Sequence, residues 1–155
     1  MTEGTKSYLF GCHNFLIHPL CVLFAWKKHY RQWPMFWQIV CIFLHDIGIC
    51  GMNYLSVDKK GHWRKGAKIA LKLFGRKGYL FCKGHTSENG FKSKLWIADK
   101  KSWLIAPRFW LWCNYYIEGF KVITPPLWIS LVKKELEKEN PKGAHELYLS
   151  AKEQL

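Results

Sequence analysis

Histidines and aspartates stand in apolar segments of this sequence, where an isolated ionisable side chain would be unstable. Residues 43–51, FLHDIGICG, end an apolar run with His45 and Asp46 side by side. His18 and Asp99 lie in the similarly apolar stretches FLIHPLCVLFAW and LWIADKKSW. A buried carboxylate costs several kcal/mol unless it is paired or metal-bound. We therefore interpret these four residues as metal ligands; the alternative is a buried polar cluster satisfied by hydrogen bonds.

Two further histidines are candidates for a catalytic role or for a second metal ion. His62 opens a predicted helix, and His85 lies in the loop GHTSENGFK. Each could instead be an ordinary polar residue at a helix start or in a loop. Imidazole and carboxylate ligands together suit divalent ions such as Mn, Fe, Co, Ni or Zn, and Mg remains an alternative. We expect one divalent ion, with a second if His62 and His85 also bind.

The sequence is strongly basic, with a formal net charge of +13. Residues 131–155 carry five Lys and five Glu, so the excess lies in residues 1–130. Such a charge favours an anionic partner, namely phosphate, nucleic acid or a membrane surface, although it could serve solubility alone. Basic residues flank two of the candidate site residues. We name as candidate substrate-binding residues Lys59, Lys60, Arg64 and Lys100.

Helical signals dominate the chain, and strand-like alternation is sparse, so the sequence predicts an all-α protein. Pro19 and Pro34 are typical of helix first turns, whereas Gly48 and Gly75 are typical of helix ends. Pro125 and Pro126 indicate a turn before an amphipathic tail. The predicted helices span residues 19–31, 34–47, 62–75, 78–83, 92–105 and 107–116.

The predicted helix over residues 62–75 has two distinct faces. Gly66, Ala67 and Ala70 are small enough to let a neighbouring helix approach closely. The opposite face is expected to be solvated and carries Lys65, Lys68 and Lys72. Farther along the chain, the Trp-rich stretch 103–112 is expected to form core or a subunit interface.

The order of these residues resembles the HD-domain superfamily of metal-dependent phosphohydrolases. That family has a histidine, then a His-Asp doublet, then a late aspartate, commonly with further histidines between. The corresponding residues here are His18, His45, Asp46, His62, His85 and Asp99. The segments HPLCVLFAW, LHDIG, GHWRKGAKIALKLFG and SKLWIADKK look like the family's, especially like small HD hydrolases of bacteria and their phages. The resemblance covers roughly residues 13–105.

Two departures from the family pattern concern the surroundings of the ligands. Many members read His-Asp-x-Gly-Lys, but Ile49 takes the place of the lysine here. His85 is followed by Thr86 and Ser87, where some relatives have a second histidine or Ser-Arg. Any role of that lysine must therefore be absent or supplied elsewhere, and the difference after His85 affects the second metal site more than the first.

The resemblance implies a compact multi-helix HD-domain bundle that hydrolyses a phosphoester with metal-activated water. Together with the basic charge and small size, it favours a nucleotide substrate: a deoxynucleoside mono- or triphosphate or a related phosphoester. One alternative is a phosphodiesterase or nuclease that acts on nucleic acid or a cyclic nucleotide. Another is a non-catalytic scaffold that binds a nucleotide or a protein partner.

At 155 residues, the chain is expected to form one domain, with a metal-site core at about 13–105 and C-terminal helices over 106–155. None of the six cysteines forms a C-x-x-C pair, which gives no support to a zinc finger. Several lie in apolar helical runs, so we expect reduced thiols and a cytoplasmic protein. The N-terminus lacks a signal-peptide pattern. The longest apolar stretch, 34–51, is short for a bilayer span and contains two ionisable residues, so we expect no transmembrane segment. A homo-oligomer is an open alternative, in which the aromatic second half of the chain would lie between the subunits.

Overall fold

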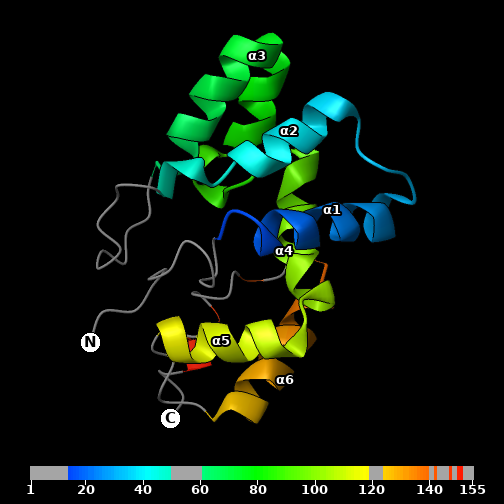
Figure 1. The fold of residues 1–155 in the computed structure, drawn as a ribbon, viewed down its shortest axis with the longest axis vertical. Coiled ribbons are helices and arrows are strands. Elements are labelled where there is room, and N and C mark those ends of the chain that lie inside the picture. Colours follow the sequence, from blue (N-terminus) through cyan, green and yellow to red (C-terminus); the bar gives the residue numbers. More distant parts are fainter. Residues whose placement is uncertain are drawn as a thin grey trace.

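The computed structural model describes residues 14–49, 61–118, 124–139, 142, 147, 150 and 151. This part of the chain is all-α, as predicted, and two short 3₁₀ turns accompany the helices (Figure 1). The helices are α1 (Ile17–Tyr30), α2 (Phe36–Leu44), α3 (Trp63–Lys83), α4 (Lys94–Ile105), α5 (Arg108–Glu118) and α6 (Pro125–Leu136). The 3₁₀ turns are η1 (Ile47–Ile49) and η2 (Ser87–Asn89). Among the described residues, no helix is both long enough and apolar enough to span a bilayer.

Helices α1 and α4 pack against each other and lie between two apolar cores. In Figure 1, α2 and α3 lie above this pair, and α5 and α6 lie below it. The upper core contains Val22 and Trp26 of α1, whereas Cys21 of the same helix belongs to the lower core. Helix α1 therefore buries two faces, each against a different core.

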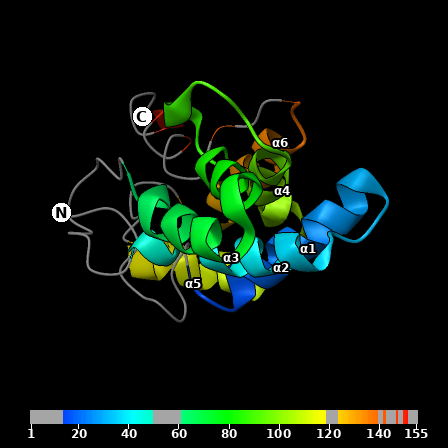
Figure 2. The same cartoon turned by 90° about the horizontal axis from the view of Figure 1, so that it is seen from above.

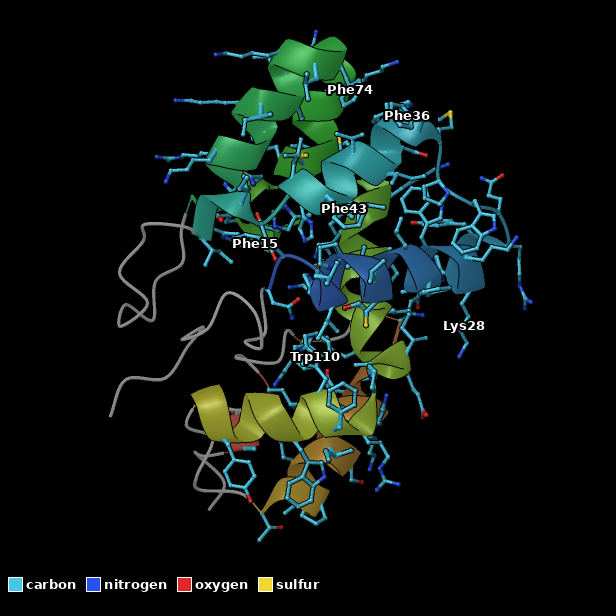
Figure 3. All side chains as sticks on the ribbon, in the orientation of Figure 1. Phe15, Lys28, Phe36, Phe43, Phe74 and Trp110 are labelled. Carbon is cyan, nitrogen blue, oxygen red and sulfur yellow. The ribbon has the colours of Figure 1, made fainter. Side chains whose placement is uncertain are left out.

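The lower core is built largely from tryptophan. Trp103 of α4 stacks on Trp110 of α5 with ring centroids 5.3 Å apart, and Trp128 of α6 is fully buried beside them. Trp110 lies between α1 and α5 in Figure 3. The buried part of the Trp-rich stretch is thus core, one of its two predicted roles, although Phe109 remains exposed.

Helix α3 consists of two legs that reverse direction at Gly75. The backbone of Gly75 has φ 68° and ψ −158°, values that glycine adopts without the steric penalty of a side chain. A Cβ on Gly78 would lie 2.7 Å from the carbonyl oxygen of Ala70, so the second leg returns directly against the first. The rings of Trp63 and Tyr79 meet across the legs, with centroids 6.1 Å apart. Figures 1 and 2 show the two legs side by side.

Several predicted boundaries differ from the observed ones by a few residues. Helix α1 begins at Ile17, before the predicted 19–31. Helix α2 begins at Phe36, because the side chain of Gln38 accepts a hydrogen bond from the Met35 backbone N–H and fixes the helix start there. The predicted turn at Pro125 is wrong. That proline lies in the first turn of α6, where its missing N–H costs no helical hydrogen bond.

Candidate metal centre

Four buried side chains from three parts of the chain form the first cluster. The Nε2 atom of His18 lies 3.0 Å from Oδ1 of Asp99 and 3.4 Å from Oδ2 of Asp46. The Nε2 atom of His45 lies 3.3 Å from Oδ2 of Asp46 and 3.5 Å from Oδ1 of Asp99. The two Nε2 atoms are 3.3 Å apart. The four side chains predicted as metal ligands therefore converge in space.

The spacing of these atoms fits a single ion of ordinary size. Two ligand atoms each about 2.1 Å from one ion are about 3.0 Å apart at a right angle and about 3.4 Å apart at the tetrahedral angle. The nitrogen–oxygen distances of the first cluster run from 3.0 to 3.5 Å. The buried His and Asp groups are thus positioned to hold a metal ion, and two imidazoles with two carboxylates suit a divalent transition metal.

Local structure fixes the position of each ligand. His18 lies in the first turn of α1, where Oδ1 of Asn14 accepts hydrogen bonds from the backbone N–H groups of Leu16, Ile17 and His18. Asp99 lies within α4, the helix packed against α1. His45 and Asp46 follow the last residue of α2. The side-chain amide of Asn14 therefore secures the helix start that orients His18.

A second cluster consists of His62, His85 and Asp46. The Nε2 atoms of the two histidines lie 3.0 Å apart. Oδ1 of Asp46 lies 3.3 Å from Nε2 of His85 and 3.6 Å from Nε2 of His62. These three residues form a further group that could hold an ion. The hairpin of α3 explains the pairing, because the reversal at Gly75 brings the start of the first leg and the end of the second leg together.

Two histidines are oriented by the same hydrogen bond. Nδ1 of His45 lies 2.5 Å from the carbonyl oxygen of Ile42, and Nδ1 of His85 lies 2.5 Å from that of Cys82. A carbonyl can only accept, so each Nδ1 carries the proton and donates it. When the ring is neutral, each Nε2 then offers its lone pair to its cluster, which is the arrangement of metal-binding histidines in general.

Two glycines let α3 approach the end of α2 closely. A Cβ on Gly48 would lie 1.5 Å from the carbonyl oxygen of His62. A Cβ on Gly66 would lie 2.2 Å from the carbonyl oxygen of Leu44. Any larger residue would push the start of α3 away and separate His62 from Asp46. This contact confirms the prediction that Gly66 lets a neighbouring helix approach.

The charges of the first cluster stabilise one another. Burial lowers the pKa of His18 and His45, but hydrogen bonds and the charges of Asp46 and Asp99 outweigh it and raise both pKa values above 6.5. Burial likewise raises the pKa of Asp99, yet hydrogen bonds from His18 and His45 hold that pKa well below its usual range. The clustered histidines therefore keep a buried carboxylate ionised, which is the form that binds a cation.

The predicted substrate-binding residues differ in where the structure places them relative to the clusters. Nζ of Lys100 lies 3.9 Å from Oδ2 of Asp99, so this lysine stands beside the first cluster. The guanidinium of Arg64 lies over the ring of Trp63, with 6.0 Å to the ring centroid, and its side chain is exposed. Lys59 and Lys60 lie outside the described residues. Of the two that the structure describes, Lys100 is the one that lies beside the cluster.

Glu88 belongs to the second cluster's surroundings and was not predicted from the sequence. Its carboxylate accepts hydrogen bonds from the backbone N–H of Gly61, at 3.1 and 3.3 Å, and its Oε1 lies 3.9 Å from Nδ1 of His62. This carboxylate ties η2 to the start of α3 and approaches the face of His62 away from Asp46. The sequence signal that could have identified Glu88 is its position, an acidic side chain three residues after His85.

Comparison with known proteins adds no further support for the site. No family model, curated protein or solved structure matches the chain.

Proposed function

We propose that the protein is a metal-dependent phosphohydrolase of the HD type that acts on a nucleotide. The observation that carries this proposal is the position of Asp46 between the two clusters. Its Oδ2 faces His18 and His45, and its Oδ1 faces His62 and His85. A carboxylate shared in this way can hold two ions close together, as phosphoester-cleaving sites with two metals require. The ordered His and Asp residues, which resemble the HD pattern, support the same assignment.

The two clusters would each hold one metal ion. Asp99, His18 and His45 would hold the first ion, and His62 and His85 would hold the second, with Asp46 shared. When bound, such ions lower the pKa of a coordinated water toward neutrality and offset charge on phosphoryl oxygens. Without a second ion, His62 and His85 would move protons, because an imidazole ring can accept a proton on one nitrogen and donate one from the other.

The surroundings of the clusters favour an anionic substrate. Lys100 places a cation beside Asp99, and the chain as a whole has a net charge of +13. A phosphoryl group that entered between the clusters would meet this ammonium group as well as the ions. The substrate class that we propose is a deoxynucleoside mono- or triphosphate or a related phosphoester, cleaved with release of a phosphate-containing product.

The decisive experiment joins metal analysis to a phosphate-release screen. Purified protein is loaded with Mn, Fe, Co, Ni, Zn or Mg and tested on nucleoside mono- and triphosphates, with release of inorganic phosphate or pyrophosphate as the readout. Asp46→Asn should lose bound metal and turnover together while helicity by circular dichroism is unchanged. The exposed carboxylate of Glu137 provides a control, Glu137→Gln, that should retain both.

Three results would reject the proposal or change its substrate. Turnover that survives Asp46→Asn would remove the site from the reaction. Tight nucleotide binding without turnover in every metal would identify a binding scaffold instead of an enzyme. Cleavage of DNA or RNA with a steep dependence on salt would identify a polymer substrate, because a polymer contact releases many counterions and a mononucleotide contact few.

A further inference from the structure

Large apolar side chains face solvent where α1 passes into α2. Trp33, Met35 and Phe36 are 55%, 58% and 77% exposed, and Phe24 near the end of α1 is 56% exposed. The rings of Phe24 and Trp33 pack edge to face with centroids 5.9 Å apart, so the two belong to one surface. We call these four residues the corner surface, because the connection between α1 and α2, beside which they lie, protrudes at the right of both Figure 1 and Figure 2.

The corner surface continues along α1. Leu16, Leu20 and Phe24 follow one another at four-residue spacing and therefore share one face of the helix. All three are exposed, Leu16 by 62% and Leu20 by 39%. An apolar patch of this extent is unusual for a surface that meets only water and marks a site of contact with another apolar phase.

Basic residues surround the corner surface without opposing carboxylates. Lys27 lies with its Nζ atom 5.6 Å from the ring centroid of Trp33, and Lys28 and Arg31 are exposed beside it. Figure 3 shows Phe36 and Lys28 on the same side of the molecule. Over the described residues 14–49 and 61–83, Asp46 is the only acidic residue, and it is buried. This part of the described surface is therefore uniformly cationic.

The combination of charge and apolar area selects the partner. A second copy of the chain docked through the same face would bring like charges together, because a two-fold interface uses the same residues on both sides. The rings of Phe24, Trp33 and Phe36 could stack on nucleotide bases, but Met35 and the adjoining Leu16 and Leu20 offer no ring for stacking. A bilayer with anionic lipids accommodates both features, since apolar side chains enter the acyl boundary while Lys and Arg contact headgroup phosphates.

We propose that the corner surface docks the protein on an anionic lipid bilayer. Trp33, Met35 and Phe36 enter the interfacial region, and the neighbouring lysines and arginine contact the lipid phosphates. The residues that enter the bilayer, Trp33, Met35 and Phe36, lie at the opposite end of α1 and α2 from the metal centre, because His18 begins α1 and His45 follows α2. Docking through these residues therefore does not involve the metal centre and does not depend on the proposed hydrolase activity.

The first test is co-sedimentation of the full chain with phosphatidylcholine vesicles, with and without phosphatidylglycerol. The wild-type protein should bind only the vesicles that contain phosphatidylglycerol. Trp33→Ser/Phe36→Ser should lower the partition coefficient tenfold or more, on the order expected for two large apolar side chains. The control Phe109→Ser/Leu127→Ser removes two exposed apolar side chains from α5 and α6, 61% and 48% exposed, and should bind as the wild type does.

The second test separates docking at this surface from general attraction of a basic protein. The two charge variants are Lys27→Gln/Lys28→Gln/Arg31→Gln at the corner surface and Lys65→Gln/Lys68→Gln/Lys72→Gln on α3. Each basic residue near an anionic bilayer adds to the free energy of binding, so the corner variant, which lacks three of them, should lose roughly a hundredfold in affinity for the vesicles. The α3 variant has the same net charge and should lose far less. Bound metal and circular dichroism report whether each variant is folded.

Several outcomes would overturn the proposal. The corner surface is not a lipid-docking site if the wild-type protein does not bind vesicles that contain phosphatidylglycerol, or if both charge variants lose affinity for these vesicles equally. It is also rejected if Phe109→Ser/Leu127→Ser abolishes binding while Trp33→Ser/Phe36→Ser does not. Binding of short DNA that depends on the same residues, without vesicle binding, would assign the surface to nucleic acid instead.

Discussion

Asp46 and His85 are 39 residues apart in the sequence, yet Oδ1 of Asp46 lies 3.3 Å from Nε2 of His85. The other carboxylate oxygen of Asp46 lies 3.4 Å from Nε2 of His18, in the first cluster. One side chain therefore contacts both groups of candidate ligands. Because a protein that binds two ions through one carboxylate loses both when that carboxylate is removed, this relationship distinguishes Asp46 from every other candidate ligand.

Metal stoichiometry tests the shared position of Asp46. Asp46→Asn should weaken metal binding at both clusters, because an amide offers one neutral oxygen where the carboxylate offers two charged ones. Asp99→Asn should affect the first cluster alone, and His85→Asn the second alone. Isothermal titration with Mn or Zn, together with metal analysis after dialysis, measures the number of sites. Equal losses in all three variants would argue against two separate clusters.

Gly48 is predicted to be essential for the close backbone contact between η1 and the start of α3. Gly48→Ala places a Cβ 1.5 Å from the carbonyl oxygen of His62, so the backbone must move. We expect a loss of about 3 kcal/mol in the free energy of unfolding and weaker metal binding at the second cluster. Gly90→Ala is the comparison, because its Cβ meets open space and only its φ of 72° is unfavourable, at about 1 kcal/mol. Urea unfolding of both variants, with metal analysis, checks the difference.

The sequence was sufficient to predict which residues converge on the candidate metal centre but not how they are shared between its two clusters. Apolar surroundings and order along the chain identified His18 and Asp99, because burying such groups unpaired is unfavourable whatever the fold. The pairing of His62 with His85 depends on the reversal at Gly75, and a glycine in a sequence does not reveal its φ angle. The two-sided role of Asp46 is a tertiary property that no local pattern encodes.

The raised pKa values of His18 and His45 predict how the metal-free protein responds to pH. A histidine whose pKa is higher in the folded protein than its ordinary 6.5 stabilises the fold below pH 6.5. That contribution disappears as the pH rises through the raised pKa. Urea unfolding in EDTA should therefore show decreasing stability above pH 6.5. A stability that stays flat from pH 6.5 upward would contradict charged pairing with Asp46 and Asp99.

The same histidines make metal binding depend on pH in the opposite direction. Protons and metal ions compete for the Nε2 atoms of His18 and His45, and the raised pKa values extend this competition above pH 6.5. Apparent affinity at the first cluster should therefore keep increasing as the pH rises beyond 6.5. Titration of His85→Asn, which retains only the first cluster, isolates this effect. An affinity that levels off at pH 6.5 would indicate histidines with ordinary pKa values.

Lys100 is predicted to contact the substrate rather than to position Asp99 for metal binding. Its Nζ atom lies 3.9 Å from Oδ2 of Asp99, on a side chain that is 28% exposed, so it can reach an incoming phosphoryl oxygen from solvent. Lys100→Gln should retain metal and raise KM on the order of tenfold with little change in kcat, the effect of losing one charged contact of about 1.5 kcal/mol. Lys101→Gln, at the next position of α4, should leave KM unchanged. A loss of bound metal in Lys100→Gln would instead indicate that the ammonium group positions Asp99.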